Sequence, residues 1–252
     1  MNSNFPKQTS IVIIGGGIMG CSTAYHLTKN GCKDVILLER VKLTCGTTWH
    51  SAAQVRQLRS SESLTRIVQN SVNLYSNLEK ETGQATGWKE TGSLSIANNK
   101  DRLTHIRRQA SLSRAFGIGA EEITVKKAAE KWPLMRNDDL LGAVFSPSDG
   151  RVNPSDVCTA LIKASKLRGL KVFEDTPVTG ITTRNGRISS IQTSKGEISC
   201  DKIVNCAGIW GRQVAGMAGV AAPLHACEHF YLLTEIINSV NGPLPTLSDH
   251  DG

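Results

Sequence analysis

Hydrophobic and polar positions form alternating blocks near the start of the chain. An apolar stretch at residues 11–14 precedes a glycine-rich turn, an amphipathic stretch that ends near Gly31, and a second apolar stretch at residues 35–39. Apolar residues at helical spacing between two short apolar runs are typical of a β-α-β unit. The N-terminal part is therefore predicted to begin a parallel α/β sheet.

Helical and strand patterns alternate through the next part of the chain. Helices are predicted at residues 61–82 and 101–116, with a strand at residues 92–98 between them. Pro154 fits the first helical position of a third helix, for which Asn153 is a candidate N-cap. Gly169 is expected to end this third helix.

The last third of the chain is predicted to be rich in strands. The turn signals Asn-Gly in "RNGR" and Lys-Gly in "SKGE" separate short strands of a meander. The segment "DKIVNCAGIWG" then has the pattern of a strand that meets a nucleotide, so the interrupted dinucleotide fold is expected to resume there. A further long strand is predicted in "LHACEHFYLLTEI", residues 224–236.

The composition is typical of a water-soluble globular enzyme. The 252 residues are 39% hydrophobic and 20% charged, and no apolar run approaches the roughly 20 residues that span a bilayer. The first ten residues lack an apolar signal core, so no cleaved leader is expected. The seven cysteines form no CxxC pair, which favours reduced thiols in a cytosolic or matrix compartment.

The formal net charge of +7 comes from lysines and arginines that are scattered along the chain. Because no basic block with interleaved aromatic residues is present, nucleic-acid binding is not expected. A mildly positive protein attracts an anionic dinucleotide and a carboxylate substrate.

A nucleotide site is predicted at the first strand-helix junction. Gly15, Gly17 and Gly20 form GxGxxG between the strand and the helix, where they permit a tight turn, close approach of a pyrophosphate and close helix packing. Glu39 lies at the end of the second strand, where a carboxylate accepts hydrogen bonds from adenosine ribose hydroxyls. FAD or NAD is therefore expected; the alternative is a glycine turn in another α/β protein with a solvated Glu39.

Several longer motifs resemble one family of flavoproteins. These motifs are "IVIIGGGIMG", "VILLER", "LTCGTTWHSAA", "TGWKETGSLSIANN", "WPLM", "DDLLGAVFSPSDG" and "NCAGIW". Together they resemble the sarcosine and dimethylglycine dehydrogenase family, with the sarcosine dehydrogenases most similar around "LTCGTTWH", "RQLRSSE" and "SDHD". The segment "PLHACEHFYLLT" is more similar to the related regulatory subunit of pyruvate dehydrogenase phosphatase.

The resemblance implies that His50, in the TWH motif, carries FAD covalently through the 8α-methyl carbon of the flavin. A neutral imidazole nitrogen can add to the methide that forms when this acidified methyl group loses a proton. The regulatory relative lacks the histidine, so His50 favours an enzyme; without the resemblance it would be interpreted as a polar loop residue. The family follows the histidine with Ala-Gly, whereas Ala52 and Ala53 stand nearby here, so a loop that needs a positive φ would have to rearrange.

The resemblance also implies further cofactor-binding and catalytic residues. The additional cofactor-binding residues are Arg40, Thr44, Cys45, Gly46, Thr47, Thr48, Val178, Ala207, Gly208 and Trp210. The catalytic candidates are His229 and Tyr231, which would share one face of the last strand with Cys227 and His225 because side chains alternate. This pattern leaves core packing and a metal site open as alternatives, although no further ligand cluster is visible and no metal is predicted.

The predicted fold is an α/β Rossmann-like FAD-binding domain interleaved with an α+β antiparallel-sheet substrate domain that is incomplete at the C-terminus. The FAD-binding domain is assigned to residues 8–86 and 148–222, and the substrate domain to residues 87–147 and 223–252. The resemblance covers only the N-terminal part of the family, so the chain is expected to be a fragment, a short product or one piece of a split enzyme.

The implied reaction is oxidative N-demethylation of sarcosine or dimethylglycine, with electrons passed to electron-transfer flavoprotein. Folate would bind only through domains absent here, the arginine that clamps the substrate carboxylate is not assigned, and no membrane partner is expected. The implied location is the mitochondrial matrix in a eukaryote and the cytoplasm in a bacterium. A non-catalytic regulatory subunit and a non-covalent FAD amino-acid oxidase remain alternatives.

Overall fold

The structure is a computed structural model that describes residues 5–59, 61–238, 240 and 242–249. The chain divides into two compact units, each assembled from three stretches. Unit 1 comprises residues 1–52, 78–86 and 154–230; unit 2 comprises residues 53–77, 87–153 and 231–252. The roles of FAD-binding and substrate domain, assigned from the sequence, stay predictions for these units. Among the helices of the described ranges, none is both long and apolar enough to cross a membrane.

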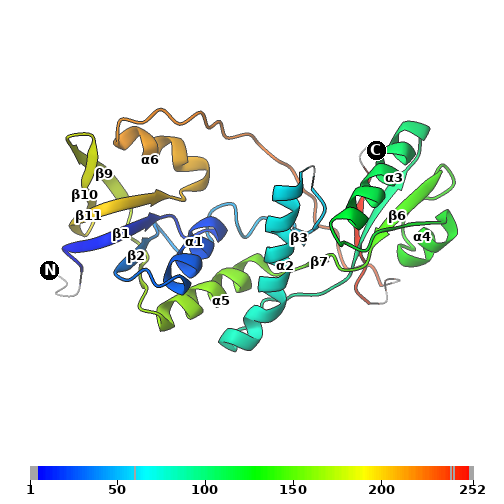
Figure 1. Cartoon of the computed structure of the whole chain (residues 1–252), viewed down its shortest axis with the longest axis horizontal. Helices are drawn as coiled ribbons and strands as arrows, with labels where there is room; N and C mark the ends of the chain where they lie inside the picture. The colour runs from blue at the N-terminus through cyan, green and yellow to red at the C-terminus, as the bar shows by residue number, and fades with distance from the viewer. Residues whose placement is uncertain (1–4, 60, 239, 241, 250–252) are drawn as a thin grey trace. The chain divides into compact units, whose positions relative to one another are not determined.

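Unit 1 is built on a six-stranded sheet with the order β8-β2-β1-β11-β10-β9 (Figure 1). Its strands are β1 (Gln8–Ile14), β2 (Val35–Leu38), β8 (Lys171–Phe173), β9 (Val178–Arg184), β10 (Arg187–Thr193) and β11 (Gly196–Asn205). β1 pairs in parallel with β2 and with β11, and β2 pairs in parallel with β8. The predicted parallel α/β fold is confirmed, and the chain returns to β1 through β11 as "DKIVNCAGIWG" predicts.

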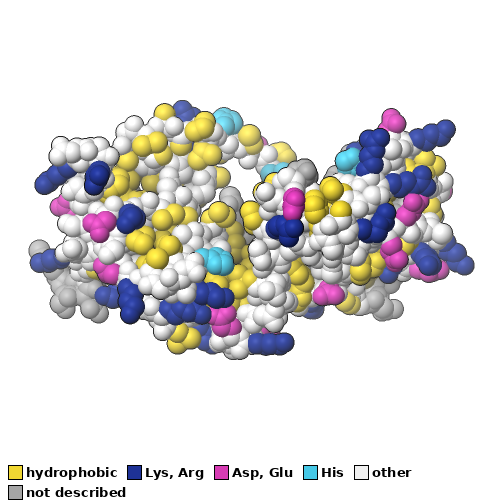
Figure 2. Space-filling view, viewed as in Figure 1, with side chains coloured by type: hydrophobic (Ala, Val, Ile, Leu, Met, Phe, Trp, Pro, Cys, Tyr) yellow, Lys and Arg dark blue, Asp and Glu magenta, His cyan; other side chains and the backbone are white. Residues whose placement is uncertain are grey.

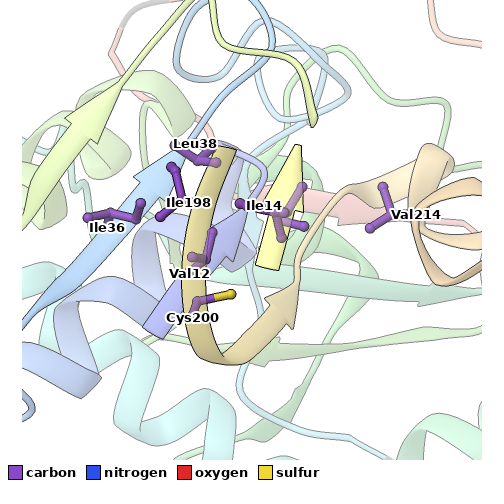
Figure 3. Packing of buried hydrophobic residues seen from close by; sticks show 8 residues of the cluster. Val12, Ile14, Ile36, Leu38, Ile198, Cys200 and Val214 are labelled. Carbon is purple, nitrogen blue, oxygen red and sulfur yellow. The ribbon is translucent and has the colours of Figure 1, made fainter. Parts of the chain in front are cut away.

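The core of unit 1 lies against the parallel strands. Because side chains alternate across a strand, Val12 and Ile14 of β1 face the same side, where Ile36 and Leu38 of β2 join them. Figure 3 shows these residues packed with others from β11 and from α6, and together they form one hydrophobic cluster. Burying one such side chain stabilises a fold by about 1.5–3 kcal/mol, so this cluster fixes the strand ends that carry the site.

The helices of unit 1 among the described residues are α1 (Ile18–Lys29), α5 (Pro154–Leu167), the short 3₁₀ helix η1 (Gly208–Trp210) and α6 (Gly211–Met217). The first two lie where the sequence signals predict them. α1 and α5 pack against each other. Pro154 begins α5 and Gly169 follows its end with a φ of +98°, a conformation that favours glycine. The helix α6 is not predicted by the sequence reasoning, since its seven residues are too few to show a helical period.

The predicted Asn-Gly turn joins β9 to β10. Asn185 and Gly186 have φ angles of 52° and 72°, so both central residues adopt the positive φ that a type I′ turn requires. The two strands pair antiparallel and continue into β11, as a meander does.

Unit 2 holds a four-stranded sheet with the order β12-β4-β6-β5 and a separate two-stranded pair of β3 and β7. The strands are β3 (Gln54–Val55), β4 (Ser93–Ala97), β5 (Glu121–Ile123), β6 (Gly142–Ser146), β7 (Gly150–Arg151) and β12 (Thr246–Ser248). The helices are α2 (Glu62–Thr82), whose last turns belong to unit 1, α3 (Lys100–Ala115) and α4 (Val125–Lys131). The predictions of helices at residues 61–82 and 101–116 and of a strand at residues 92–98 are confirmed.

The strand predicted at residues 224–236 is wrong. The structure has no strand or helix between α6 and Ile237, and Phe230, Leu232 and Ile236 are 84%, 85% and 91% exposed. Figure 2 shows hydrophobic side chains uncovered along this part of the chain. An apolar alternating pattern becomes a strand only where a partner strand satisfies its backbone groups, and none of residues 225–236 is paired into a sheet of the described chain.

The loss of that strand removes the argument that placed His229 and Tyr231 on one face. Both side chains are exposed. Within the described residues, no group of three or more His, Cys, Asp and Glu side chains is placed to hold a metal ion. Two residues of the "SDHD" motif, at positions 250 and 251, lie outside the described residues.

Candidate functional site

The glycine-rich turn between β1 and α1 is shaped by backbone contacts that exclude side chains. The N–H of Gly15 donates to the carbonyl of Leu38 at 2.8 Å, and Gly15 has a φ of +110°. A Cβ at Gly15 would lie 2.7 Å from the carbonyl carbon of Cys206, and a Cβ at Gly20 would overlap the carbonyl oxygen of Gly15. Both glycines are therefore required by the crossing of β1, β11 and α1.

Gly17 and Thr48 lie at the N-terminus of α1. Gly17 is the N-cap residue of the helix and provides no side-chain cap, and no acidic residue occupies the first turn. The hydroxyl of Thr48 accepts a hydrogen bond from the N–H of Ile18 at 3.0 Å and lies where a Cβ on Gly17 would come within 2.8 Å. The positive end of the α1 dipole therefore lies beside the backbone of Gly17, which no side chain covers. This arrangement binds phosphate groups.

Glu39 connects the end of β2 to the glycine turn. One carboxylate oxygen accepts a hydrogen bond from the N–H of Gly16 at 2.7 Å, and the other accepts from the N–H of Val41 at 3.0 Å. Only 8% of Glu39 is exposed. The thiol of Cys45 also donates to the carboxylate, at 3.9 Å. Because a carboxylate has about four acceptor positions, these three bonds leave capacity for a ribose hydroxyl.

A pocket of about 290 Å³ opens above the turn. The residues of the sequence-predicted cofactor set that line it are Gly15, Gly17, Glu39, Arg40, Cys45, Gly46, Thr47, Thr48, Val178, Ala207, Gly208 and Trp210. Its walls come from the ends of β1, β2 and β11, the loop after β2 and the loop before β9. These segments lie far apart in the sequence but belong to the same unit.

One wall of the pocket is a stacked pair. The guanidinium group of Arg40 lies 3.6 Å from the ring centroid of Trp210, close enough for a cation–π interaction. The same indole ring lies 3.5 Å from the position that a Cβ on Gly46 would take. The pair therefore presents a flat, positively charged surface, which is suited to an aromatic base or an anionic group.

Buried thiols support the turn from below. The thiol of Cys21 donates to the carbonyl of Gly16 at 3.5 Å, and the hydrogen bond with Cys158, together with burial, raises the pKa of Cys21 well above its usual range. Burial also raises the pKa of Cys206. These thiols stay protonated and neutral, so they act in packing and do not add negative charge beside a phosphate site.

Some predicted residues do not line the pocket. Gly20 lies beneath the turn, and Thr44 has its N–H bonded to the carbonyl of Gly16 at 2.9 Å. His50 is exposed, with its ring centroid 3.6 Å from that of Trp49, and it follows the pocket residues Thr47 and Thr48 by only a few positions.

The loop after His50 has a positive φ at an alanine. Ala53 has a φ of +59°, the conformation that a glycine at this position would adopt without strain. An L-residue in this conformation costs about 1–2 kcal/mol, which the surrounding structure must offset.

The sequence reasoning missed the pocket residues on α6 and on the loop before β9. These residues are Thr176, Pro177, Gln213, Val214 and Met217. The spacing of the last three places them on one face of a short helix. The sequence therefore carries a helical signal here, but a segment of seven residues is too short to distinguish a helix from a loop.

The glycine turn, the helix N-terminus beside Gly17 and the acid at the end of β2 define a dinucleotide-binding α/β unit, and the comparisons with known proteins identify its class. Residues 10–252 match the family described as "FAD dependent oxidoreductase". The chain belongs to this family. The resemblance drawn from the sequence motifs is therefore confirmed, and FAD is the cofactor of the family.

Individual relatives refine the comparison. The chain is 41% identical over 252 residues to the mitochondrial sarcosine dehydrogenase of Mus musculus, covering 98% of this chain and 27% of that protein. It is also 41% identical over 251 residues to the mitochondrial pyruvate dehydrogenase phosphatase regulatory subunit of Mus musculus, covering 98% of this chain and 28% of that protein. The chain thus spans little more than a quarter of the length of these relatives.

Among solved structures, the L-proline dehydrogenase of P. horikoshii superposes with a TM-score of 0.81 at 30% sequence identity. The match covers 86% of this chain and 57% of that chain. The predicted fold class, an FAD-dependent oxidoreductase fold with mixed sheets, is confirmed by this similarity.

Proposed function

We propose that the chain takes part in FAD-dependent oxidative N-demethylation of an N-methylated glycine, either sarcosine or dimethylglycine. The observation that carries the proposal is the glycine-lined pocket of unit 1 in a chain 41% identical to a sarcosine dehydrogenase. When bound, FAD supplies the acceptor for a hydride from the N-methyl group, and water converts the resulting iminium to formaldehyde and the demethylated amino acid.

The residues of the pocket fit the parts of FAD by their chemistry. The N-terminus of α1 and the backbone of Gly17 would hold the pyrophosphate, and the spare acceptor capacity of Glu39 would bind the ribose. The stacked Arg40 and Trp210 offer a surface for an aromatic or anionic part, and Val178 would contact the adenine through its backbone. The remaining predicted cofactor-binding residues fill the walls around them: Thr44, Cys45, Gly46, Thr47, Thr48, Ala207 and Gly208.

His50 is proposed as the covalent attachment site of the flavin. Its exposure supports this role, because a nucleophile must be reachable by the group it attacks. Its position shortly after Thr47 and Thr48, which line the pocket, supports it further. His229 and Tyr231 are proposed as substrate-facing residues on the family resemblance alone.

The acceptor, compartment and larger context are also proposals. Electrons would pass to electron-transfer flavoprotein, and folate would bind only through sequence beyond this chain. The matched relatives are named as mitochondrial proteins, so a mitochondrial matrix location is proposed if the source is a eukaryote.

The activity is tested by anaerobic flavin reduction. The chain is loaded with FAD and mixed with sarcosine, N,N-dimethylglycine or glycine, while the absorbance of oxidised flavin is recorded. We expect an N-methylated substrate to bleach the flavin and release one formaldehyde per flavin, and glycine to have no effect. Bound flavin that no substrate reduces would contradict the proposal and favour a regulatory role, whereas peroxide formation in air would identify an oxidase.

Covalent attachment is tested by acid precipitation. Flavin is expected in the pellet of the wild-type chain and in the supernatant of the His50→Ala variant. His105→Ala is the matched control, because His105 is an exposed histidine on α3 that no part of the proposal uses. Flavin in the wild-type supernatant would exclude the covalent bond without excluding the proposed reaction.

A further inference from the structure

A second pocket of unit 1, with a polar lining, lies at the start of β1. Its volume is about 290 Å³, and its lining comes from β1, β9, β10 and β11, which are neighbours in the six-stranded sheet (Figure 1). Most of the lining residues carry polar side chains: Gln8, Thr9, Arg184, Ser189, Ser199 and Asp201. Pockets that bind small molecules have volumes of about 300–1,000 Å³, so this pocket is suited to a small ligand.

The polar pocket is separate from the glycine-lined pocket. Gln8 and Thr9 are the first residues of β1, whereas Gly15 follows its last residue and lines the other pocket. Strand residues that rise about 3.3 Å each place the two ends of β1 roughly 20 Å apart. Among the described residues, none lines both pockets. A ligand in the polar pocket would therefore take no part in chemistry at a cofactor bound in the glycine-lined pocket.

The polar pocket holds one cation and one anion that do not pair. Arg184 and Asp201 both line it, and both are exposed. Within the part of the chain that the structure describes, neither forms an ion pair with the other or with a third side chain. Burial, and after it the charge of Asp201, raises the pKa of the thiol of Cys200, another lining residue, to about 11. The carboxylate of Asp201 therefore acts on the pocket, and the two unpaired charges can each hold one group of a ligand.

The hairpin that carries Arg184 also indicates an anionic group. Arg184 and Arg187 are direct partners across the antiparallel pair of β9 and β10, on the two sides of the turn at Asn185 and Gly186. Like charges directly opposite each other destabilise a sheet. No carboxylate among the described residues forms an ion pair with either arginine. An anionic group bound by Arg184 would offset this repulsion.

We propose that the polar pocket binds a small zwitterionic amino acid, with its carboxylate on Arg184 and its ammonium group on Asp201. A planar guanidinium presents paired N–H groups to a carboxylate, and a carboxylate accepts the N–H groups of an ammonium ion. The hydroxyls of Ser189 and Ser199 provide donors and acceptors beside these charges.

The two charges select against ions that carry only one charge. An anion meets the repulsion of Asp201, and a cation meets the repulsion of Arg184, whereas a zwitterion satisfies both. The site is independent of the proposed function, because no residue of the glycine-lined pocket contributes to it.

The test compares a zwitterion with its two halves. Binding of glycine, acetate and methylamine to the FAD-loaded chain is measured by calorimetry for wild type, Arg184→Gln and Asp201→Asn. We expect glycine to bind wild type at least about ten-fold more tightly than acetate or methylamine, because each of these carries only one of the two charges. The affinity for glycine should fall by about ten-fold or more in either variant, since each variant loses one charge-assisted hydrogen bond.

The matched control is Arg187→Gln, which removes an exposed arginine from the same hairpin but not from the pocket lining. It should keep the affinity for glycine within about two-fold, because exposed charges contribute little. Glycine is also the product of sarcosine demethylation, so glycine binding that persists unchanged in Arg184→Gln and Asp201→Asn belongs to another site and would overturn the assignment. Absence of glycine binding to wild type would overturn it as well.

Thermal unfolding distinguishes a ligand-binding arginine from one that only stabilises the hairpin. Without ligand, Arg184→Gln should unfold at the same Tm as wild type or at a higher one, because the like-charge pair is removed. Excess glycine should raise the Tm of wild type and of Arg187→Gln but not that of Arg184→Gln, since a ligand stabilises the folded chain that binds it. A lower Tm of Arg184→Gln without ligand would assign Arg184 to the stability of the hairpin and contradict the proposal.

Discussion

Gly20 offers a sharp test of how α1 is seated on the glycine turn. A Cβ at this position would overlap the carbonyl oxygen of Gly15 and lie 3.0 Å from its carbonyl carbon and 3.5 Å from the Cβ of Cys206. Gly15 cannot move away easily, because its N–H is bonded to Leu38 and its own space is limited by Cys206. Gly20→Ala must therefore separate the helix from two strands.

The sign of the effect follows from two opposing contributions. Alanine stabilises a helix interior by about 1 kcal/mol relative to glycine. Overpacking of a tight site costs about 1–3 kcal/mol, and more where the obstacle is backbone. We expect Gly20→Ala to lower the free energy of unfolding by about 2 kcal/mol or more, which is a decrease in Tm of roughly 4–8 °C for a chain of this size.

Gly216 provides the matched control. It lies in the helix α6, and a Cβ there would meet nothing within 4 Å. Gly216→Ala should therefore stabilise the chain by about 0.5–1 kcal/mol through helix propensity alone. Urea unfolding followed by circular dichroism, without FAD, measures both variants. If Gly20→Ala proved as stable as Gly216→Ala, the close contact between α1 and the turn would be refuted.

Three further predictions follow from particular side chains. Ala53→Gly should raise Tm by an amount corresponding to about 0.5–1 kcal/mol, because the relief of a positive φ exceeds the added chain entropy of glycine, and a lower Tm would contradict this. At pH 8, iodoacetamide should label the exposed Cys45 within minutes. Cys200 should react only after unfolding, because burial raises the pKa of its thiol to about 11. Peptide mass spectrometry measures both, and rapid labelling of Cys200 in the native chain would refute its burial. Trp210→Leu should weaken FAD binding by about three- to thirty-fold, because the stacked surface of Trp210 and Arg40 is lost, whereas Trp210→Phe should retain most of the affinity. Fluorescence titration with FAD measures both variants. An unchanged affinity in Trp210→Leu would exclude a contact between FAD and this surface.

The parts of the fold that the sequence predicts well are those governed by local rules. The glycine spacing, the apolar strand at residues 11–14, and the start of α5 at Pro154 with Gly169 after its end are each determined by local sequence, and the structure confirms these predictions. The turn at Asn185 and Gly186 is another example, since a positive φ is demanded by the turn itself. Such signals need no information from the rest of the chain.

The predictions that fail depend on partners far away in the sequence. Residues 224–236 have the alternation of a strand, but strand pairing is a property of two segments, and these residues pair with none that the structure describes. The buried carboxylate of Asp149 accepts hydrogen bonds from the N–H of Gln57 and the hydroxyl of Ser93. The sequence reasoning missed this role because both partners are distant in sequence. The hydroxyls of Ser95 and Ser248 come together at Arg56 only because β12 pairs with β4.

Glu39 of unit 1 and Arg56 of unit 2 differ in how their charges are compensated. In unit 1, the buried carboxylate of Glu39 accepts two backbone N–H groups, so its charge is compensated before any ligand binds. In unit 2, the guanidinium of Arg56 donates to two hydroxyls, and the buried carboxylate of Asp149 compensates its charge only through space. A compensated acid suits a permanent cofactor, because the loop must keep its shape whether or not the ribose is present.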